Sequence, residues 1–268
     1  MNPAILQTTI RTPVGFSHRG LRSGRTSGVR LRPGLPDTGI VFNGRIPATA
    51  VHAFVEGHAV GLRSADESVF GVEHLLAACY GLGVDNLRVD VSGDEVPFGD
   101  GSALPFVRII RAAGLRAMDR RRRVQTVNRP VAAWAGDSCV VAFPTDDGGL
   151  PNISCVIDFP DKEVGLQSFR ASPEAESFAA EVGPARTFGR WDDDRPLPAW
   201  LGRSAHTVDG MALPNRPRYP NEQARHKTLD LMGDLCLLGR RLHARVFAYK
   251  SGHRLHHEFL RKLEEEWT

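Results

Sequence analysis

The stretch VEHLLAACYGLG, residues 72–83, has the composition of a buried helix and ends in glycines that stop it. It is followed by NLRVDVSG at 86–93, which alternates like a strand. GSALPFVRIIRAAG at 101–114 is again helical, with Ser102 as its expected N-cap. Upstream, the first 70 residues read as short strands separated by turns: QTTIRT (7–12), GVRLRP (28–33), GIVFNG (39–44) and the extended run AVHAFVEGHAVGL (50–62).

The second half of the chain repeats this order of strands, helix, strand, helix. The pattern indicates strands at 124–134, 138–145 and 153–159, a helix at 221–239, a strand at 244–252 and a closing helix at 253–267. We therefore expect an α+β fold of two related domains, 1–118 and 124–268, each a sheet packed on a pair of helices. Equivalent helices would bring their residues to the cleft between the domains, where binding sites tend to form.

Composition is that of a soluble globular protein, since 41% of the 268 residues are hydrophobic and 24% are charged. The net charge of +3 is mild and indicates no class of partner. We interpret the basic run Arg120–Arg123 as a solvated segment between elements, with contact to anionic lipid or a phosphate-bearing substrate as the alternative. The run is too local, and no motif is present, to predict a nucleic-acid partner.

Cysteine usage and the N-terminal residues indicate a cytoplasmic enzyme or binding protein. The four cysteines are scattered, as expected of buried apolar residues in a reducing compartment. No basic region followed by an apolar core opens the chain, so we expect no signal peptide. No segment approaches the 18 or so apolar residues of a membrane span.

The stretch RHKTLDLMGDL, residues 225–235, carries the spacing of a metal site. His226 and Asp230 are four residues apart, so on a helix they lie on one face about 5–6 Å apart and can chelate one ion. A catalytic zinc needs three protein ligands and leaves a fourth position for water. His74, near the start of the corresponding helix in the first half, is the natural third ligand.

Amide hydrolysis at such a site needs acid–base groups as well. Glu73 is placed to be the base that activates water, and His253 is a candidate acid or oxyanion stabiliser. Asp234, one turn beyond the predicted ligand on the same helix, would orient His253 and raise its pKa. Lys227 could add positive charge where the oxyanion develops.

Each of these groups also has an alternative interpretation without a functional role. Glu73 fits an acid that caps a helix N-terminus, and His226 with Asp230 fits an exposed pair on a solvated helix. His253, at the start of the closing helix, also fits a surface residue. We interpret the neighbouring His256 and His257 as surface residues. Spacing alone leaves the metal hypothesis open.

Longer motifs place the chain near a known family. The matching stretches are VEHLLAACYGLGVDN (72–86), EVPFGDGSALPFV (95–107), ARTFG (185–189), RHKTLDLMGDL (225–235) and AYKSGH (248–253), with RPGLPDTGIVF (32–42) also fitting. In these stretches, and in their order, the sequence resembles the zinc-dependent UDP-3-O-acyl-N-acetylglucosamine deacetylases of lipid A biosynthesis. The resemblance spans nearly the whole chain and implies two α+β domains with the active site between them.

The resemblance implies a role for each matching position. The zinc ligands would be His74, His226 and Asp230. Glu73 would be the general base and His253 the catalytic histidine, supported by Asp234. The cofactor implied is Zn²⁺, although a set of two histidines and one aspartate also tolerates Fe²⁺.

The resemblance also implies how the substrate is held. Lys227 would contact the substrate, Phe188 would line its site, and Thr187 would stabilise the oxyanion. The partner is then a small molecule, an acylated UDP-amino sugar whose 2-acetamido group is hydrolysed to release acetate. We expect a monomer, and a transient contact with a membrane surface stays open.

The departures from the family pattern concern specificity more than chemistry. The chain reads GVEH at 71–74 where the family usually has TVEH, Leu21-Arg22-Ser23-Gly24 where it has L-H-[ST]-G, and Asp158–Lys162 where it has D-F-x-H-P. Residues 190–214, where the family inserts a unit that holds an acyl chain, are short and polar and include Asp192–Asp194. Burying an acyl chain gains about 0.8 kcal/mol per CH₂, and an acidic, turn-rich insert is poorly suited to supply it.

These departures leave three readings. The first is a genuine deacetylase with a shorter acyl chain or a rebuilt passage. The second is a related zinc amidase acting on another acylated amino sugar or nucleotide sugar. The third is a metal-binding paralogue with little turnover.

Overall fold

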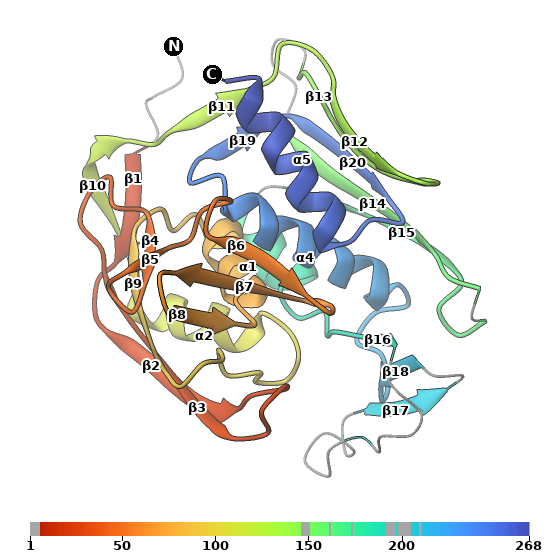
Figure 1. Cartoon of the computed structure of the whole chain (residues 1–268), viewed down its shortest axis with the longest axis horizontal. Helices are drawn as coiled ribbons and strands as arrows, with labels where there is room; N and C mark the ends of the chain where they lie inside the picture. Colours follow the sequence, from red (N-terminus) through yellow and green to blue (C-terminus); the bar gives the residue numbers. More distant parts are fainter. Residues whose placement is uncertain are drawn as a thin grey trace.

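Two five-stranded sheets flank a layer of helices (Figure 1). The computed structural model describes residues 6–145, 151–160, 162–172, 174–190, 197, 205–208 and 211–267. The first sheet has the order β2-β3-β9-β4-β5, formed by Val14–Arg19, Thr26–Pro33, Leu87–Ser92, Ile40–Phe42 and Ile46–Pro47. The second has the order β12-β13-β20-β14-β15, formed by Val131–Ala135, Ser138–Phe143, Arg245–Tyr249, Asn152–Asp158 and Leu166–Ala171.

The two sheets share one topology. In the first, the middle strand β9 pairs antiparallel with β3 and parallel with β4. In the second, β20 pairs antiparallel with β13 and parallel with β14. The repeated strand order is what a duplicated α+β unit predicts, and the predicted fold class is confirmed. The domain boundaries at 118 and 124 stay a prediction.

The helices lie between the sheets and pack on one another (Figure 1). The four long helices are α1 (Glu73–Leu82), α2 (Leu104–Ala113), α4 (Glu222–Cys236) and α5 (His253–Glu265). A short turn α3 (Ala175–Ser177) runs into a π-helix η1 (Phe178–Val182). Helix α1 packs closely against α4, and α4 against α5, so their inward faces share one apolar core with the sheets. The N-cap of α2 is Ala103 and not Ser102 as predicted, although the Ser102 hydroxyl accepts a hydrogen bond from Leu104 N, the first residue of the helix, at 3.1 Å.

The described residues also form four smaller sheets. They are formed by β1 (Leu6–Ile10) with β10 (Leu115–Arg121), by β6 (Ala53–Glu56), β7 (Ala59–Ser64) and β8 (Glu67–Phe70), by β11 (Val124–Thr126) with β19 (Arg241–His243), and by β16 (Gly189–Arg190), β18 (Met211–Pro214) and β17 (Ala205–Val208). The run expected to be one extended segment at 50–62 is therefore largely a hairpin. The strand expected at 124–134 is interrupted before Pro130, which has no N–H to donate to a ladder.

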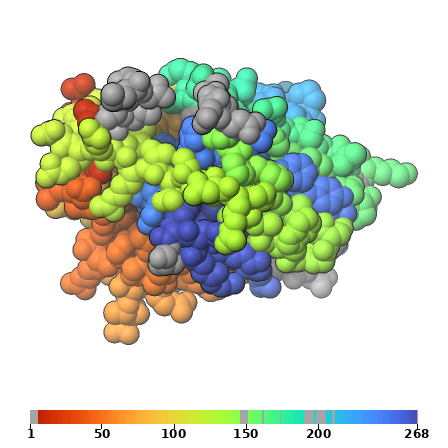
Figure 2. Space-filling model, turned by 90° about the horizontal axis from the view of Figure 1, so that it is seen from above, coloured from red at the N-terminus to blue at the C-terminus, as the bar shows by residue number. Residues whose placement is uncertain are grey.

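The arginine run is solvated as predicted at Arg120, Arg121 and Arg123, which are exposed, but it does not lie wholly between elements. Arg120 and Arg121 end strand β10, and Arg121 pairs with Leu6 of β1. The side chain of Arg122 is only 14% exposed and binds the carboxylate of Asp85 at 2.9 Å. Figure 2 shows the yellow-green segment that contains the run passing from the red and orange first half toward the green and blue second half.

Apolar residues in the described part of the insert at 190–214 contribute to the core, and a polar character of the insert as a whole stays a prediction. Met211 and Leu213 on β18 are buried and pack in an apolar cluster with Phe188. The aspartates that suggested a polar insert, Asp192–Asp194, lie outside the described residues. None of the helices in the described part of the chain is long and apolar enough to span a bilayer.

Candidate metal and catalytic site

The first turn of α1 is anchored from strand β7. The carbonyl of Val60 accepts hydrogen bonds from Gly71 N (2.9 Å) and Val72 N (3.2 Å). Its amide donates to Glu73 Oε2 at 3.1 Å. Gly71 has a φ of 67°, a left-handed conformation that suits glycine, so the chain can turn sharply into the helix. Glu73 and His74 thus start a helix whose position is set by the strand before it.

A close crossing of α1 and α4 brings the two halves of the site together. A Cβ built on Gly233 would lie 2.4 Å from the carbonyl oxygen of Glu73. Only glycine allows the backbones to approach this closely. The first turn of α1 therefore faces the middle of α4, where His226 and Asp230 lie.

His74, His226 and Asp230 converge on one point, with a ligand atom from each lying within 4.8 Å of the others. Asp230 Oδ1 is 3.3 Å from His226 Nε2 and 4.0 Å from His74 Nε2. Two ligand atoms on a tetrahedral zinc stand about 3.4 Å apart, given bonds of about 2.0–2.2 Å. Burial, together with the nearby His226, lowers the pKa of His74 to about 3, so the imidazole is neutral, as a ligand must be. The donor set fits a zinc ion.

Lys227 lies beside this cluster but is already paired. Its ammonium donates to Asp230 Oδ2 at 2.8 Å. Burial would lower the pKa of Lys227, but the Asp230 carboxylate outweighs it and the pKa is raised. Burial alone would raise the pKa of Asp230. The charges of Lys227 and His226 outweigh burial and hold that pKa well below its usual range. Asp230 is therefore ionised and Lys227 cationic in the metal-free protein.

Glu73 and His253 have pKa values displaced in the direction that acid–base catalysis needs. Burial raises the pKa of Glu73 to about 7. Burial alone would lower the pKa of His253, but the Asp234 carboxylate raises it to about 9. His253 is the first residue of α5, and its Nδ1 donates to Asp234 Oδ2 at 2.7 Å. Near neutral pH the histidine is cationic and the glutamate is close to half ionised.

The expectation that His256 and His257 are surface residues was wrong. His256 is fully buried, and its Nδ1 donates to the same Asp234 oxygen at 2.6 Å. Burial lowers the pKa of His256, so its Nε2 is free to accept from the Ser251 hydroxyl at 2.8 Å. His257 Nε2 lies 3.5 Å from Asp234 Oδ1. Asp234 thus binds two histidines and lies close to a third, a result of the packing of α5 on α4.

The ARTFG segment lies against the predicted metal ligand His226. The Ala185 carbonyl accepts a hydrogen bond from His226 Nδ1 at 3.1 Å, which leaves Nε2 of that ring for a metal. Thr187 N donates to the Gly101 carbonyl at 2.7 Å, so this segment is tied to the first half of the chain. The Phe188 ring meets the His226 ring edge-on, with centroids 6.3 Å apart.

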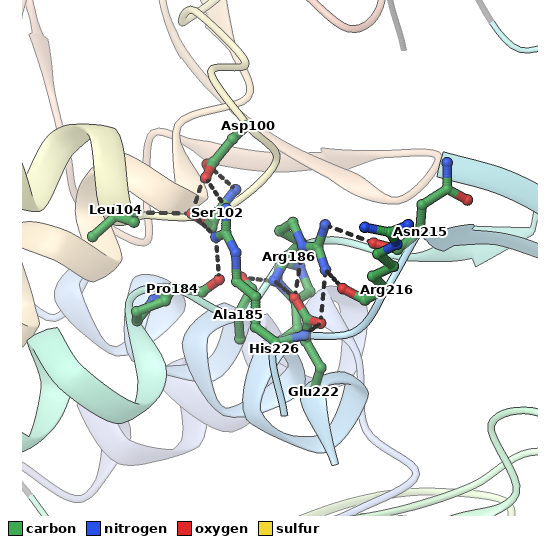
Figure 3. A network of polar contacts seen from close by, with 11 residues as sticks. Asp100, Ser102, Leu104, Pro184, Ala185, Arg186, Asn215, Arg216, Glu222 and His226 are labelled. Atoms are coloured by element: carbon green, nitrogen blue, oxygen red, sulfur yellow. Dashed lines mark hydrogen bonds and ion pairs between the residues drawn. The ribbon is translucent and has the colours of Figure 1, made fainter. Parts of the chain in front are cut away.

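Polar residues that the sequence analysis did not single out surround this segment (Figure 3). They are Asp100, Arg186 and Glu222, which Figure 3 labels, and Arg218, which pairs with Asp100. Glu222 precedes His226 by four residues, so it shares a helix face with a predicted ligand, but an acid in a first turn is ordinarily a capping group. His58, in the β6–β7 turn, was also missed, and burial with the nearby charges of Lys227 and His253 lowers its pKa.

Comparison with known proteins gives one consistent result. The family model described as UDP-3-O-acyl N-acetylglycosamine deacetylase matches residues 7–265. A UDP-3-O-acyl-N-acetylglucosamine deacetylase of Syntrophotalea carbinolica is 35% identical, covering 97% of this chain and 88% of that protein. Proteins of the same name from Nitratidesulfovibrio vulgaris and Myxococcus xanthus are 37% and 36% identical, covering 97% and 96% of this chain and 88% and 86% of theirs.

Proposed function

The chain belongs to the UDP-3-O-acyl-N-acetylglucosamine deacetylase family, and from that premise we propose that it hydrolyses the 2-acetamido group of a UDP-3-O-acyl-N-acetylglucosamine and releases acetate. The observation that carries the proposal is the convergence of His74, His226 and Asp230 from two helices, beside Glu73. Those three residues would hold a zinc ion, or Fe²⁺. When bound, the ion polarises the amide carbonyl and lowers the pKa of water at its open position.

Glu73 is the general base of this mechanism. Its pKa of about 7 makes the carboxylate basic enough to take a proton from water while a large fraction stays ionised near neutral pH. The hydrogen bond from Val60 N occupies Oε2 and leaves Oε1 to receive the proton. Burial excludes bulk water from the carboxylate, which is the cause of the raised pKa.

His253 is the general acid, and the remaining groups hold the substrate. With Nδ1 bound to Asp234, the imidazolium presents Nε2–H and can protonate the leaving amine. Thr187 assists the oxyanion, and Phe188 lines the site. Lys227, which binds Asp230 in the absence of substrate, contributes the positive charge that contacts the substrate.

The rate should be bell-shaped in pH, with an alkaline limb set by His253. Asparagine at position 234 still accepts the hydrogen bond from His253 but carries no charge. Because the Asp234 carboxylate is what raises the pKa of His253, Asp234→Asn should move the alkaline limb of kcat/KM to lower pH. A pH profile of the two proteins measures the shift. An alkaline limb at the same pH in both would contradict the role of His253 as acid.

The apolar cluster around Phe188 supports an acylated substrate. Met211 and Leu213 from the insert and Phe159, directly after β14, pack with Phe188, whose ring in turn meets His226. A buried apolar cluster thus lies within one ring of the predicted metal ligands.

Turnover of UDP-N-acetylglucosamine compared with its 3-O-acylated forms of increasing chain length tests the proposal. We expect kcat/KM to rise with chain length, by up to about fourfold per buried CH₂ at 0.8 kcal/mol each. Dialysis against a chelator should abolish turnover, and Zn²⁺ or Fe²⁺ should restore it. An acyl chain without effect would favour the related amidase, and stoichiometric metal binding without turnover of any form would favour the binding paralogue.

We propose that the enzyme is a monomer and that it is located in the cytoplasm. All four cysteines are free and buried, in keeping with a reducing compartment. The ligands and the acid–base groups all come from one chain, so a second copy is not needed to complete the site. Sedimentation of the purified protein, with and without vesicles of anionic lipid, tests both the monomer and a transient membrane contact.

A further inference from the structure

A buried ion pair lies directly behind the predicted metal ligand His226. Glu222, in the first turn of α4, is fully buried, and the Arg186 side chain is 11% exposed. Arg186 Nε donates to Glu222 Oε1 at 2.9 Å, and one of its terminal nitrogens donates to Oε2 at 3.1 Å. Such a two-point contact fixes the orientation of both groups, which a lysine cannot reproduce.

The same pair holds the backbone of the loop 184–187, formed by Pro184, Ala185, Arg186 and Thr187. Arg186 N donates to Glu222 Oε1 at 2.9 Å. The Arg186 guanidinium also donates to the carbonyls of Asn215 and Arg216, at 3.2 and 2.9 Å. The carboxylate of Glu222 therefore holds both the main chain and the side chain of Arg186, as Figure 3 shows.

Arg218 fastens the loop 184–187 from the other side. It donates to the Pro184 carbonyl at 2.6 Å and to Asp100 Oδ2 at 2.7 Å, so it joins the loop to the first half of the chain. Its own backbone N–H donates to Glu222 Oε2 at 2.6 Å. Asp100 in turn accepts from the Ser102 hydroxyl at 2.6 Å, at the start of α2.

We propose that the Arg186–Glu222 pair, with Arg218, is a positioning device for the metal centre: it fixes the Ala185 carbonyl that receives the Nδ1–H of His226. This inference rests on the proposed role of His226 as a metal ligand. The hydrogen bond holds the ring in the tautomer whose Nε2 carries no proton and points at Asp230. Because every residue of the loop 184–187 has a hydrogen-bonded anchor, the carbonyl cannot turn away without breaking several contacts.

The test measures zinc affinity by competition with a chromogenic chelator, together with the visible spectrum of the Co²⁺-substituted protein. Arg186→Lys keeps the charge but loses the two-point contact, and Glu222→Gln keeps the size but loses the charge. Each should raise the zinc dissociation constant by about 10–100-fold, as loss of a group that orients a ligand typically does. Each should also alter the Co²⁺ spectrum, which reports the ligand geometry.

Arg122→Lys is the matched control. Arg122 also donates two hydrogen bonds to a partly buried carboxylate, both to Asp85 Oδ2, at 3.0 and 2.9 Å, but beyond the C-terminal end of α1, away from Glu73. The Arg122→Lys variant should have a lower unfolding temperature, with the zinc affinity and the Co²⁺ spectrum unchanged. If Arg186 had only a structural role, Arg186→Lys would likewise lower the unfolding temperature and leave the zinc affinity and the Co²⁺ spectrum unchanged.

Arg218→Lys covers the case in which the buried variants do not fold, since the Arg218 side chain is 33% exposed. Arg218→Lys should raise the zinc dissociation constant, as Arg186→Lys and Glu222→Gln should. An unchanged zinc affinity in folded Arg186→Lys, or in Arg218→Lys if the others are unfolded, would overturn the inference. Absence of zinc binding by the unaltered protein would instead overturn the metal site, so the two failures are distinguishable.

Discussion

Glutamine in place of Glu73 is expected to lower kcat by about 10²–10⁴-fold, the usual contribution of a general base, while the metal content stays unchanged. The amide has the shape of the carboxylate and can still accept the hydrogen bond from Val60 N, so the start of α1 should keep its place. It cannot take a proton from water. His74 is untouched, so metal binding should persist, as metal analysis of the purified variant would show.

Glu67→Gln is the matched control for this substitution. Glu67 also lies in the first half and accepts a hydrogen bond, from Asn43 Nδ2 at 2.6 Å, but it is on strand β8 and not on the helix that carries Glu73 and His74. The Glu67→Gln variant should have the kcat of the unaltered enzyme. A Glu73→Gln variant with full metal content and a kcat within about threefold of the unaltered enzyme would remove Glu73 from the mechanism, since a base is worth at least about a hundredfold.

Alanine at Gly233 is expected to destabilise the protein and to lower activity together. In the interior of an ordinary helix the change from glycine to alanine stabilises by about 1 kcal/mol. Here the new Cβ would lie 2.4 Å from the Glu73 carbonyl oxygen, against an ordinary contact of 3.4 Å or more, so α1 and α4 must move apart by about 1 Å. Overpacking of this kind costs about 1–3 kcal/mol.

The functional effect of Gly233→Ala follows from which residue is displaced. The atom in contact belongs to Glu73, and His74 is next to it, so the base and one ligand both move away from His226. A misplacement of about 1 Å can cost about 10²-fold in rate. Thermal unfolding, zinc affinity and kcat of the variant measure the three effects. An increase in stability with unchanged kcat would mean that the crossing of the helices is looser than described.

Local pattern was sufficient for most of the secondary structure and for naming the candidate metal ligands, whereas Thr187 and Phe188 were singled out only by the family resemblance. The four long helices begin and end within about three residues of their predicted bounds, because glycine stops and apolar periodicity are properties of neighbouring residues. The i,i+4 spacing of His226 and Asp230 is likewise local, and the structure brings them together with His74. The elements that were missed, such as β2 and β10, are edge strands without strong alternation in the sequence.

By itself the sequence determined the helices, the repeated order of elements and which imidazole and carboxylate groups could meet on one helix face. Only the tertiary structure decided the environment of those groups. It buried His256 against Asp234, paired Lys227 with Asp230, and set Arg186 and Glu222 behind His226. Some of these contacts join residues far apart in the sequence, as Arg186 and Glu222 are separated by 36 positions. Others depend on which face of α4 is buried. Spacing along a chain specifies neighbours within one element, whereas burial and the pKa values that follow from it are set by the packing of elements on one another.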